Sequence, residues 1–301
     1  MPGTIIVGLD GSSESLAAAE WAAREAALRN AAVELVHVWQ PVPEPIAQAP
    51  LLGAETHQHW TDRVPREAAD GLRQRHPGVE VTTDQRSGTP ASALLEAARG
   101  AELLVLGSRA LSGITGFLIG SVGQAVTARA EVPVVLVRAG ERAADEHEAD
   151  PAGIPSAATA FRPVVLGLDI RSEDETVIAF AFEEARRRAA RLTVVQGRHL
   201  PYSYVHSMAA GYDPFEDITR EWAAELTEAL RPWRDKYPDV EVTEVSRLGS
   251  PADHLVDASH DASLVVVGRR VRRNPLGVHI GAVAHAVMHH ATAPVAVVAH
   301  S

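Results

Sequence analysis

The chain repeats itself once, and this repeat limits its possible folds more than any other feature of the sequence. The segment TIIVGLD at 4–10 returns as PVVLGLD at 163–169, an offset of 159 residues. Three further blocks return in the same order at an offset of 161 residues, beginning in the first copy at Gly88, Ala101 and Val132. Four blocks in one order at a nearly constant offset predict two domains of the same fold.

The length of the chain agrees with this division, because 301 residues are enough for two separate hydrophobic cores. We expect one domain at residues 1–140 and the other at 161–301. Residues 141–160 between them are acidic, contain Pro and Gly, and show no apolar periodicity. Such a composition is typical of a linker.

Composition excludes several classes of protein. A net charge of −11 argues against nucleic-acid and anionic-membrane partners, since both favour Lys and Arg. The absence of cysteine excludes disulfides, thiolate catalysis and cysteine-ligated zinc. Neither a signal-peptide pattern nor an apolar run of about 20 residues is present. We therefore expect a soluble, cytoplasmic protein without a membrane partner.

Each copy alternates strand patterns with helix patterns, which predicts a doubly wound parallel sheet with helices on both faces. The predicted fold is therefore two tandem Rossmann-like α/β domains, each with a five-stranded sheet. In the first copy we expect strands at Thr4–Leu9, Val33–Trp39, Val79–Asp84 (near an edge), Leu103–Leu106 and Val132–Val137. Helices are expected from Ser12 or Ser13 to Leu28, at Glu67–Arg75, from Pro90 to just before Gly100, and at Ser121–Ala130.

Sheets of this kind bind ligands outside the carboxyl ends of their strands, where the strand order reverses. The loops after Leu9 and Leu106 would share one crevice if the first and fourth strands are neighbours. The second loop is rich in glycine, with Gly107, Gly113, Gly116 and Gly120, so its backbone can approach a ligand closely. The helix that follows would present free N–H groups to an anion such as a phosphate.

These blocks resemble the universal stress protein family, in its tandem form with two domains. ATP-binding members of that family carry Gly-x2-Gly-x9-Gly-Ser/Thr after the fourth strand, where this chain has Gly107, Ala110, Gly120 and Ser121. The segments VGLDGS at 7–12 and VHVW at 36–39 resemble the family's first-strand turn and second-strand end. The resemblance covers both copies and leaves out only the linker.

The resemblance also implies roles for particular residues. Adenine or ribose would lie against Gly8, Asp10 and Val38, and the ribose and phosphates along Gly107 and Arg109. The terminal phosphates would be held by Gly120, Ser121 and Val122, with Mg²⁺ alongside. In the family the last strands pair across a dimer interface. We therefore expect Val134–Val137 and Val295–Val298 to pair as an intramolecular pseudo-dimer, and the whole chain could also form a homodimer.

Two departures from the family pattern are visible. Ala110 replaces the second glycine, which would weaken binding if that position needs a positive φ and would be harmless otherwise. The second copy keeps Gly167, Asp169, Gly268 and Gly281, but Ala282 replaces the serine and Gln196–Gly197 replaces the His–Val of the second strand. Its loop contains Arg269, Arg270, Arg272 and Arg273, which either neutralise phosphates or form the solvated or interface loop of a degenerate copy.

The remaining candidate residues favour structural explanations. His285 and His289 are four apart on a predicted helix, which could make a metal pair, but no third ligand is fixed by spacing. His57 and His59 lie in a stretch without a clear pattern. Ser12 and Ser13 lack a nucleophile elbow and fit helix capping better. We therefore predict no catalytic residues, no protein metal site, and at most slow ATP hydrolysis.

The sequence thus favours a cytoplasmic stress-response sensor or regulator that binds ATP, with Mg²⁺, and acts through protein partners that it does not identify. A scaffold of the same fold that binds no nucleotide is the alternative, supported by Ala110 and by the altered second copy. An enzyme of the wider adenine-nucleotide α-hydrolase group ranks last, because no catalytic constellation is recognisable.

Overall fold

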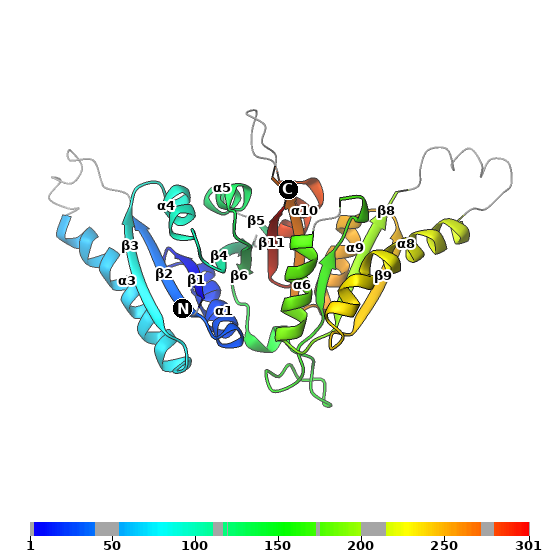
Figure 1. The fold of residues 1–301 in the computed structure, drawn as a ribbon. Coiled ribbons are helices and arrows are strands. Elements are labelled where there is room, and N and C mark those ends of the chain that lie inside the picture. The colour runs from blue at the N-terminus through cyan, green and yellow to red at the C-terminus, as the bar shows by residue number, and fades with distance from the viewer. Residues whose placement is uncertain are drawn as a thin grey trace. The chain divides into compact units, whose positions relative to one another are not determined.

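The computed structural model of the chain describes residues 3–39, 54–110, 117–118, 120–172, 175–199, 215–271 and 280–300. The chain divides into two compact units, Met1–Ala143 and Ala144–Ser301 (Figure 1). Each unit contains a parallel sheet with helices on both of its faces, as the repeat predicts. In the part of the chain that the structure describes, no helix is long and apolar enough to cross a membrane.

The sheet of the first unit has the strand order that the crevice requires. Its parallel strands run in the order β3-β2-β1-β4-β6. They are β1 (Thr4–Leu9), β2 (Ala32–Trp39), β3 (Val81–Ser87), β4 (Leu103–Ala110) and β6 (Val134–Arg138). Ile6 pairs with Glu34 on one side and Leu104 on the other, so the first and fourth strands are neighbours. The order reverses between β1 and β4, as expected.

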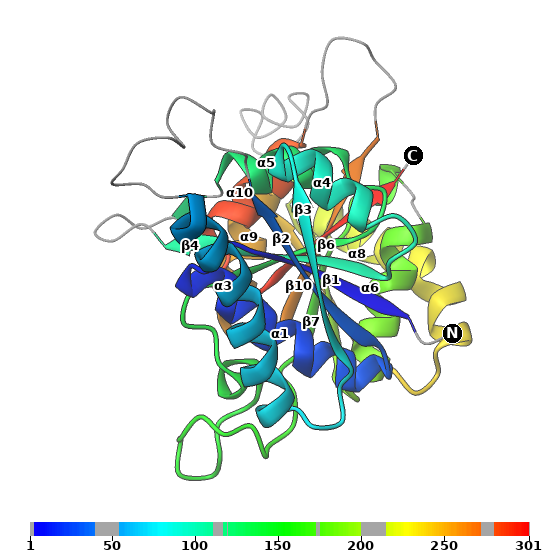
Figure 2. The ribbon, with the colours of Figure 1, turned by 90° about the vertical axis from the view of Figure 1, so that its left-hand side faces the viewer.

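Among the described residues of this unit, four helices cover the sheet, two on each face. One face is covered by α1 (Ser13–Arg29) and α3 (Ala54–Arg75), and the other by α4 (Pro90–Ala97) and α5 (Ser121–Arg129) (Figure 2). The alanine-rich α1 lies flat on β1 and β4 because its small side chains, such as Ala18, Ala22 and Ala26, are fully buried against the strands. The continuous apolar run of β1 is buried on both faces, which is typical of a central parallel strand.

The second unit repeats this arrangement, with strands in the order β9-β8-β7-β10-β11. The strands are β7 (Val164–Gly167), β8 (Leu192–Arg198), β9 (Val242–Leu248), β10 (Leu264–Arg270) and β11 (Val295–His300). One face carries α6 (Glu175–Arg187) and α8 (Phe215–Lys236), and the other carries α9 (Pro251–Ala258) and α10 (Ala282–His290). Here too the order reverses between the first and fourth strands, β7 and β10.

Several elements of the first unit differ from their predicted bounds. The strand expected at Leu103–Leu106 extends to Ala110, so Gly107 lies in β4 and not in the loop after it. The helix expected at Glu67–Arg75 begins at Ala54, so it contains His57 and His59 and runs through Pro65. The apolar residues Val64, Ala68 and Leu72 continue the four-residue spacing across this proline, so the helix keeps its buried face. The strand expected at Val79–Asp84 lies at Val81–Ser87, because its pairing with β2 extends to Trp39.

The acidic segment between the two repeats forms local hydrogen bonds. The N–H of Glu148 donates to the carbonyl of Ala160 at 2.8 Å, and the N–H of Arg162 donates to the carbonyl of Glu146 at 2.9 Å. The ring of His147 lies 4.0 Å from that of Phe161. These contacts fold residues 146–162 back on themselves within the second unit.

Candidate functional site

In the first unit, the turn between β1 and α1 lies at the carboxyl end of β1, beside the switch point. The chain turns through Gly11, whose φ of +81° favours glycine. The carboxylate of Asp10 accepts the backbone N–H of Ser12 at 3.0 Å and also its hydroxyl. The Ser12 hydroxyl oxygen accepts the N–H of Ser15 at 3.2 Å, which makes Ser12 the N-cap, as predicted. Asp10 therefore stabilises the turn through these hydrogen bonds, independently of any ligand.

The start of α5 has the geometry of an anion site. The first bond within the helix runs from the N–H of Gln124 to the carbonyl of Gly120, at 3.0 Å. The N–H groups of Ser121, Val122 and Gly123 thus precede the first possible acceptor inside the helix. A Cβ added to Gly120 would meet nothing within 4 Å. Free N–H groups at a helix start favour an anion such as a phosphate.

Gly107 is glycine for a different reason. A Cβ at this position would lie 2.4 Å from the carbonyl carbon of Glu14 and 2.7 Å from the nitrogen of Ser15. Both atoms belong to the backbone at the start of α1, which cannot move without displacing the helix. The packing of α1 on β4 therefore explains the missing side chain, and contact between Gly107 and a nucleotide stays a prediction.

Ala110 occupies an extended strand. It ends β4 and pairs in antiparallel fashion with Phe117 of the two-residue strand β5 (Phe117–Leu118), while Arg109 pairs with Leu118. An extended backbone has a negative φ, which alanine adopts without strain. The methyl group at this position therefore has no backbone cost. Gly113, Gly116 and the side chain of Arg109 lie outside the described residues.

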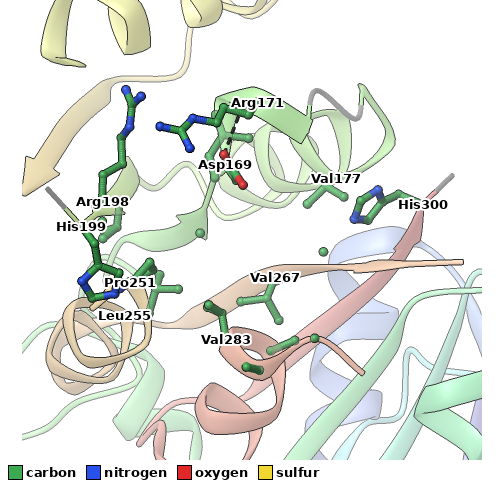
Figure 3. A pocket seen from close by; sticks show the side chains of 18 residues that line it. Asp169, Arg171, Val177, Arg198, His199, Pro251, Leu255, Val267, Val283 and His300 are labelled. Carbon is green, nitrogen blue, oxygen red and sulfur yellow. Dashed lines mark hydrogen bonds between the residues drawn. The ribbon is translucent and has the colours of Figure 1, made fainter. Parts of the chain in front are cut away.

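A cavity of about 500 Å³ lies at the switch point of the second unit (Figure 3). Its volume is within the range of small-molecule and cofactor sites. The four residues predicted for the second copy, Gly167, Asp169, Gly268 and Gly281, all line this cavity. Val177, Val195, Leu255, Val267 and Val283 give it apolar walls. The four predicted residues therefore lie around one cavity in this unit, and their contact with a ligand stays a prediction.

The first turn of α10 faces this cavity with its backbone. The N–H of His285 donates to the carbonyl of Gly281 at 2.9 Å, so the N–H groups of Ala282, Val283 and Ala284 have no acceptor within the helix. A Cβ on Gly281 would meet nothing within 4 Å, as at Gly120. The second unit thus keeps the same donors and the same open space, while Ala282 lacks the hydroxyl of Ser121.

Charged and titratable side chains surround the opposite part of the cavity. Asp169 accepts the backbone N–H of Arg171 at 3.1 Å. The guanidinium of Arg198 stacks 4.5 Å from the ring centre of Trp222 and pairs with Glu225 at 2.5 Å. Among the lining residues that sequence analysis missed, four are charged or titratable: Arg171, Arg198, His199 and His300. Comparison with the first copy could have found them, because all four replace neutral residues there.

The second unit fills the space above Gly268 with a side chain. A Cβ on Gly268 would lie 3.0 Å from the ring of His300 and 3.3 Å from Val177. In the first unit the corresponding space is filled by the backbone of α1. Arg269 and Arg270, predicted as loop residues, belong to β10. Neither of them is among the residues that line the cavity. Burial lowers the pKa of Arg269. Arg272 and Arg273 lie outside the described residues.

His285 and His289 face the same way on α10, as their spacing predicts. Their ring centres are 4.4 Å apart. Removal from water, followed by the neighbouring charges of His289 and His290, lowers the pKa of His285. Among the residues that the structure describes, no group of three His, Cys, Asp or Glu side chains is arranged to hold a metal ion. The side chains of His57 and His59 are outside the described set.

Comparisons with known proteins agree with the repeat and the fold. The family model described as the universal stress protein family matches residues 1–138 and again 160–299. A universal stress protein of Mycobacterium tuberculosis is 34% identical over 306 residues, covering 99% of this chain and 97% of the relative. One from Mycolicibacterium smegmatis is 32% identical over 300 residues, covering 98% and 96%. The crystal structure of a universal stress protein from Archaeoglobus fulgidus matches with a TM-score of 0.70 at 15% identity, covering 99% of this chain and 98% of that one.

Proposed function

The chain belongs to the universal stress protein family, and from this premise we propose that it is a cytoplasmic stress-response regulator that binds an adenine nucleotide, ATP in the first instance. The nucleotide would bind outside the carboxyl ends of the strands, at the switch point of each unit. Its presence would bias a conformation or a contact with a partner protein, including a second copy of the chain.

The cavity of the second unit carries this proposal. It combines the three N–H groups at the start of α10, the open space at Gly281, and the carboxylate of Asp169 across apolar walls. Helix N–H groups favour phosphate oxygens. A carboxylate favours the hydroxyls of a ribose, and apolar walls favour a base. In the first unit Asp10, Gly120, Ser121 and Val122 provide the matching turn and helix start.

Magnesium would reach this site with the nucleotide. Mg²⁺ prefers oxygen ligands and is commonly held by one or two carboxylates together with substrate phosphates. In the described part of the chain no cluster of three ligating side chains is available to bind the ion alone. We therefore expect Mg²⁺ to bind with the phosphates and to contribute little to the unliganded protein.

A regulatory role fits this site better than rapid catalysis. Hydrolysis would need a general base within hydrogen-bond reach of an attacking water. The carboxylate that lines the cavity, Asp169, lies in the turn after β7 and already accepts the N–H of Arg171. By analogy with the first-strand turn of the family, it would lie near the ribose, away from the terminal phosphate. We propose at most slow hydrolysis.

A scaffold without nucleotide is the second candidate, and two observations favour it for the second unit. Ala282 removes the hydroxyl present at Ser121 in the first unit. The ring of His300 occupies space directly above Gly268. In this case the cavity of the second unit would bind no physiological ligand, and the function of the protein would depend on protein partners.

Isothermal titration with ATP and Mg²⁺ decides between the two candidates. The nucleotide binder should give a saturable heat signal with folded protein, and material purified gently should carry nucleotide with excess absorbance near 260 nm. Absence of heat at millimolar ATP, in protein whose circular dichroism shows it folded, would overturn the proposed function. Titration of Gly120→Trp and Gly281→Trp variants would then assign each heat signal to its unit.

A further inference from the structure

Resting on the proposed nucleotide site, we propose that the second unit prefers a nucleotide that carries a phosphate on its ribose in addition to the 5′-phosphate. Arg171 would receive the ribose phosphate, and the start of α10 the 5′-phosphate. The first unit, which has Ser12 at the position of Arg171, would not share this preference.

The positions of the two arginines follow from the repeat. Gly8 of β1 and Gly167 of β7 occupy the same register against the second strand, opposite Val36 and Val195. Counting onward from these glycines places Arg171 at the position of Ser12. Arg198 ends β8 as Trp39 ends β2. Both arginines line the cavity, so two cationic side chains replace a serine and a tryptophan at this point of the site.

The two guanidinium groups gather at one end of the cavity. In Figure 3 the side chain of Arg171 extends towards that of Arg198, on the side opposite Val283. Arg198 is fixed by stacking on Trp222 and by its ion pair with Glu225. Arg171 has no carboxylate partner for its guanidinium among the described residues, and its side chain is exposed at the rim. It is therefore the cation that remains available to a ligand.

At four equivalent positions of this end, the two units differ in charge. In the second unit, two arginines and two carboxylates sum to zero. In the first unit, the equivalent positions hold one carboxylate and three uncharged side chains, which sum to −1. The two sets are Asp169, Arg171, Arg198 and Glu225 in the second unit, and Asp10, Ser12, Trp39 and Val64 in the first.

The contact between Asp169 and Arg171 indicates where on the ligand the second phosphate lies. The carboxylate of Asp169, which would accept a ribose hydroxyl, also accepts the backbone N–H of Arg171. The side chain of Arg171 therefore starts close to the place where the sugar would bind. In dinucleotide-binding α/β folds a carboxylate binds a free ribose hydroxyl, or an arginine nearby accommodates a phosphate on the ribose. The planar donors of arginine match phosphate oxygens. One free hydroxyl would bind Asp169, and the phosphate on the neighbouring hydroxyl would bind Arg171.

The experiment compares adenosine 5′-monophosphate with adenosine 3′,5′-bisphosphate by isothermal titration of the full chain. A Gly120→Trp background silences the first unit, so that the heat reports on the second. We expect the bisphosphate to bind about fivefold to tenfold more tightly, the size of one exposed charge-assisted contact. In the added variant Arg171→Ser, which copies Ser12, this preference should vanish while the affinity for the monophosphate changes less than about twofold.

The reciprocal variant tests the same residue in the other unit. Ser12→Arg in a Gly281→Trp background should give the first unit a preference for the bisphosphate. Equal affinities for the two nucleotides in the second unit, or a preference that survives Arg171→Ser, would overturn the inference and leave the proposed function intact. Binding of neither nucleotide to the folded second unit would overturn nucleotide binding there, and the inference with it. Circular dichroism and urea unfolding establish that each variant is folded.

Discussion

Gly107 and Glu14 are in direct backbone contact: a single Cβ at position 107 would lie 2.4 Å from the carbonyl carbon of Glu14. The first turn of α1 rests on β4 at this point, and nothing larger than a hydrogen atom fits between them. Helix packing thus explains why position 107, which the sequence predicts as a ligand contact, is a glycine.

Gly107→Ala should therefore destabilise the first unit whether or not nucleotide is present. Overpacking against a fixed backbone costs about 1–3 kcal/mol, and urea unfolding would measure the loss. Gly120→Ala is the matched control, since its Cβ would enter open space and its φ of −61° suits alanine. We expect that control to lie within about 0.5 kcal/mol of the natural protein. Equal stability of the two variants would contradict the packing explanation.

Gly281→Val should separate folding from binding in the second unit. The new Cβ would meet no protein atom within 4 Å, and the valine side chain would enter the cavity that the first turn of α10 lines. We expect unchanged stability and at least a tenfold weaker nucleotide affinity in this unit, or about 1.4 kcal/mol. Gly78→Val, whose Cβ also meets no atom within 4 Å but lies away from the cavity, should leave both quantities unchanged. An unchanged nucleotide affinity in the Gly281→Val protein would mean that the nucleotide binds elsewhere.

Glu20 should make the stability of the first unit depend on acid pH. Burial alone would raise the pKa of Glu20, but hydrogen bonds and charge from Arg75 and His76 outweigh it and lower the pKa below 4.5. A carboxyl group whose pKa falls on folding stabilises the protein above 4.5, and this stabilisation is lost as the pH drops through the folded pKa. Glu20→Gln should cost about 0.5–1 kcal/mol at pH 7, because Arg75 is largely exposed.

Urea unfolding at pH 7 and at pH 3 measures this dependence. The difference between Glu20→Gln and the natural protein should shrink at the lower pH. Glu67→Gln is the control, since its ion pair with Arg63 is exposed on both sides and should contribute nothing measurable. A penalty for Glu20→Gln that is equal at both values of pH would show that its charge does not matter.

His285 should titrate below its ordinary value of 6.5. Loss of water lowers the pKa of His285 first, and the charges of His289 and His290 lower it further. The unfolded chain therefore takes up a proton at higher pH than the folded chain, so this residue reduces the free energy of unfolding as the pH falls through 6.5. Imidazole resonances followed by NMR should show a higher pKa for His285 in His289→Gln than in the natural protein. A pKa at or above 6.5 in the natural protein would contradict this account.

The sequence predicted most of the fold because the repeat and the apolar strands are strong local signals. The neighbouring first and fourth strands, the Ser12 cap and the edge position of β3 all follow from hydrophobic patterning and connection rules. The start of α3 was missed because Pro65 reads as a helix breaker, whereas burial of Leu72 and its helical neighbours outweighs the lost hydrogen bond.

The candidate site was predicted less completely, because its residues come together only through tertiary contacts. Glycines and the helix start could be placed from spacing alone. Arg171 and His300 do not follow from such spacing, and only a comparison of the two copies marks them, because the cavity is formed by residues from different strands and loops. The difference between Gly107 and Gly120 was also hidden, because only the position of α1 distinguishes them.

The contrast between these two glycines has a consequence for reading family motifs in other genomes. Natural selection for a folded protein is enough to preserve a glycine at the position of Gly107, even in a descendant that has ceased to bind any ligand. Gly120 has no such protection, because a side chain there meets open space. In a survey of homologous sequences, loss of the glycine equivalent to Gly120 should therefore be the better sign that nucleotide binding has been lost. A retained glycine equivalent to Gly107 should count for little.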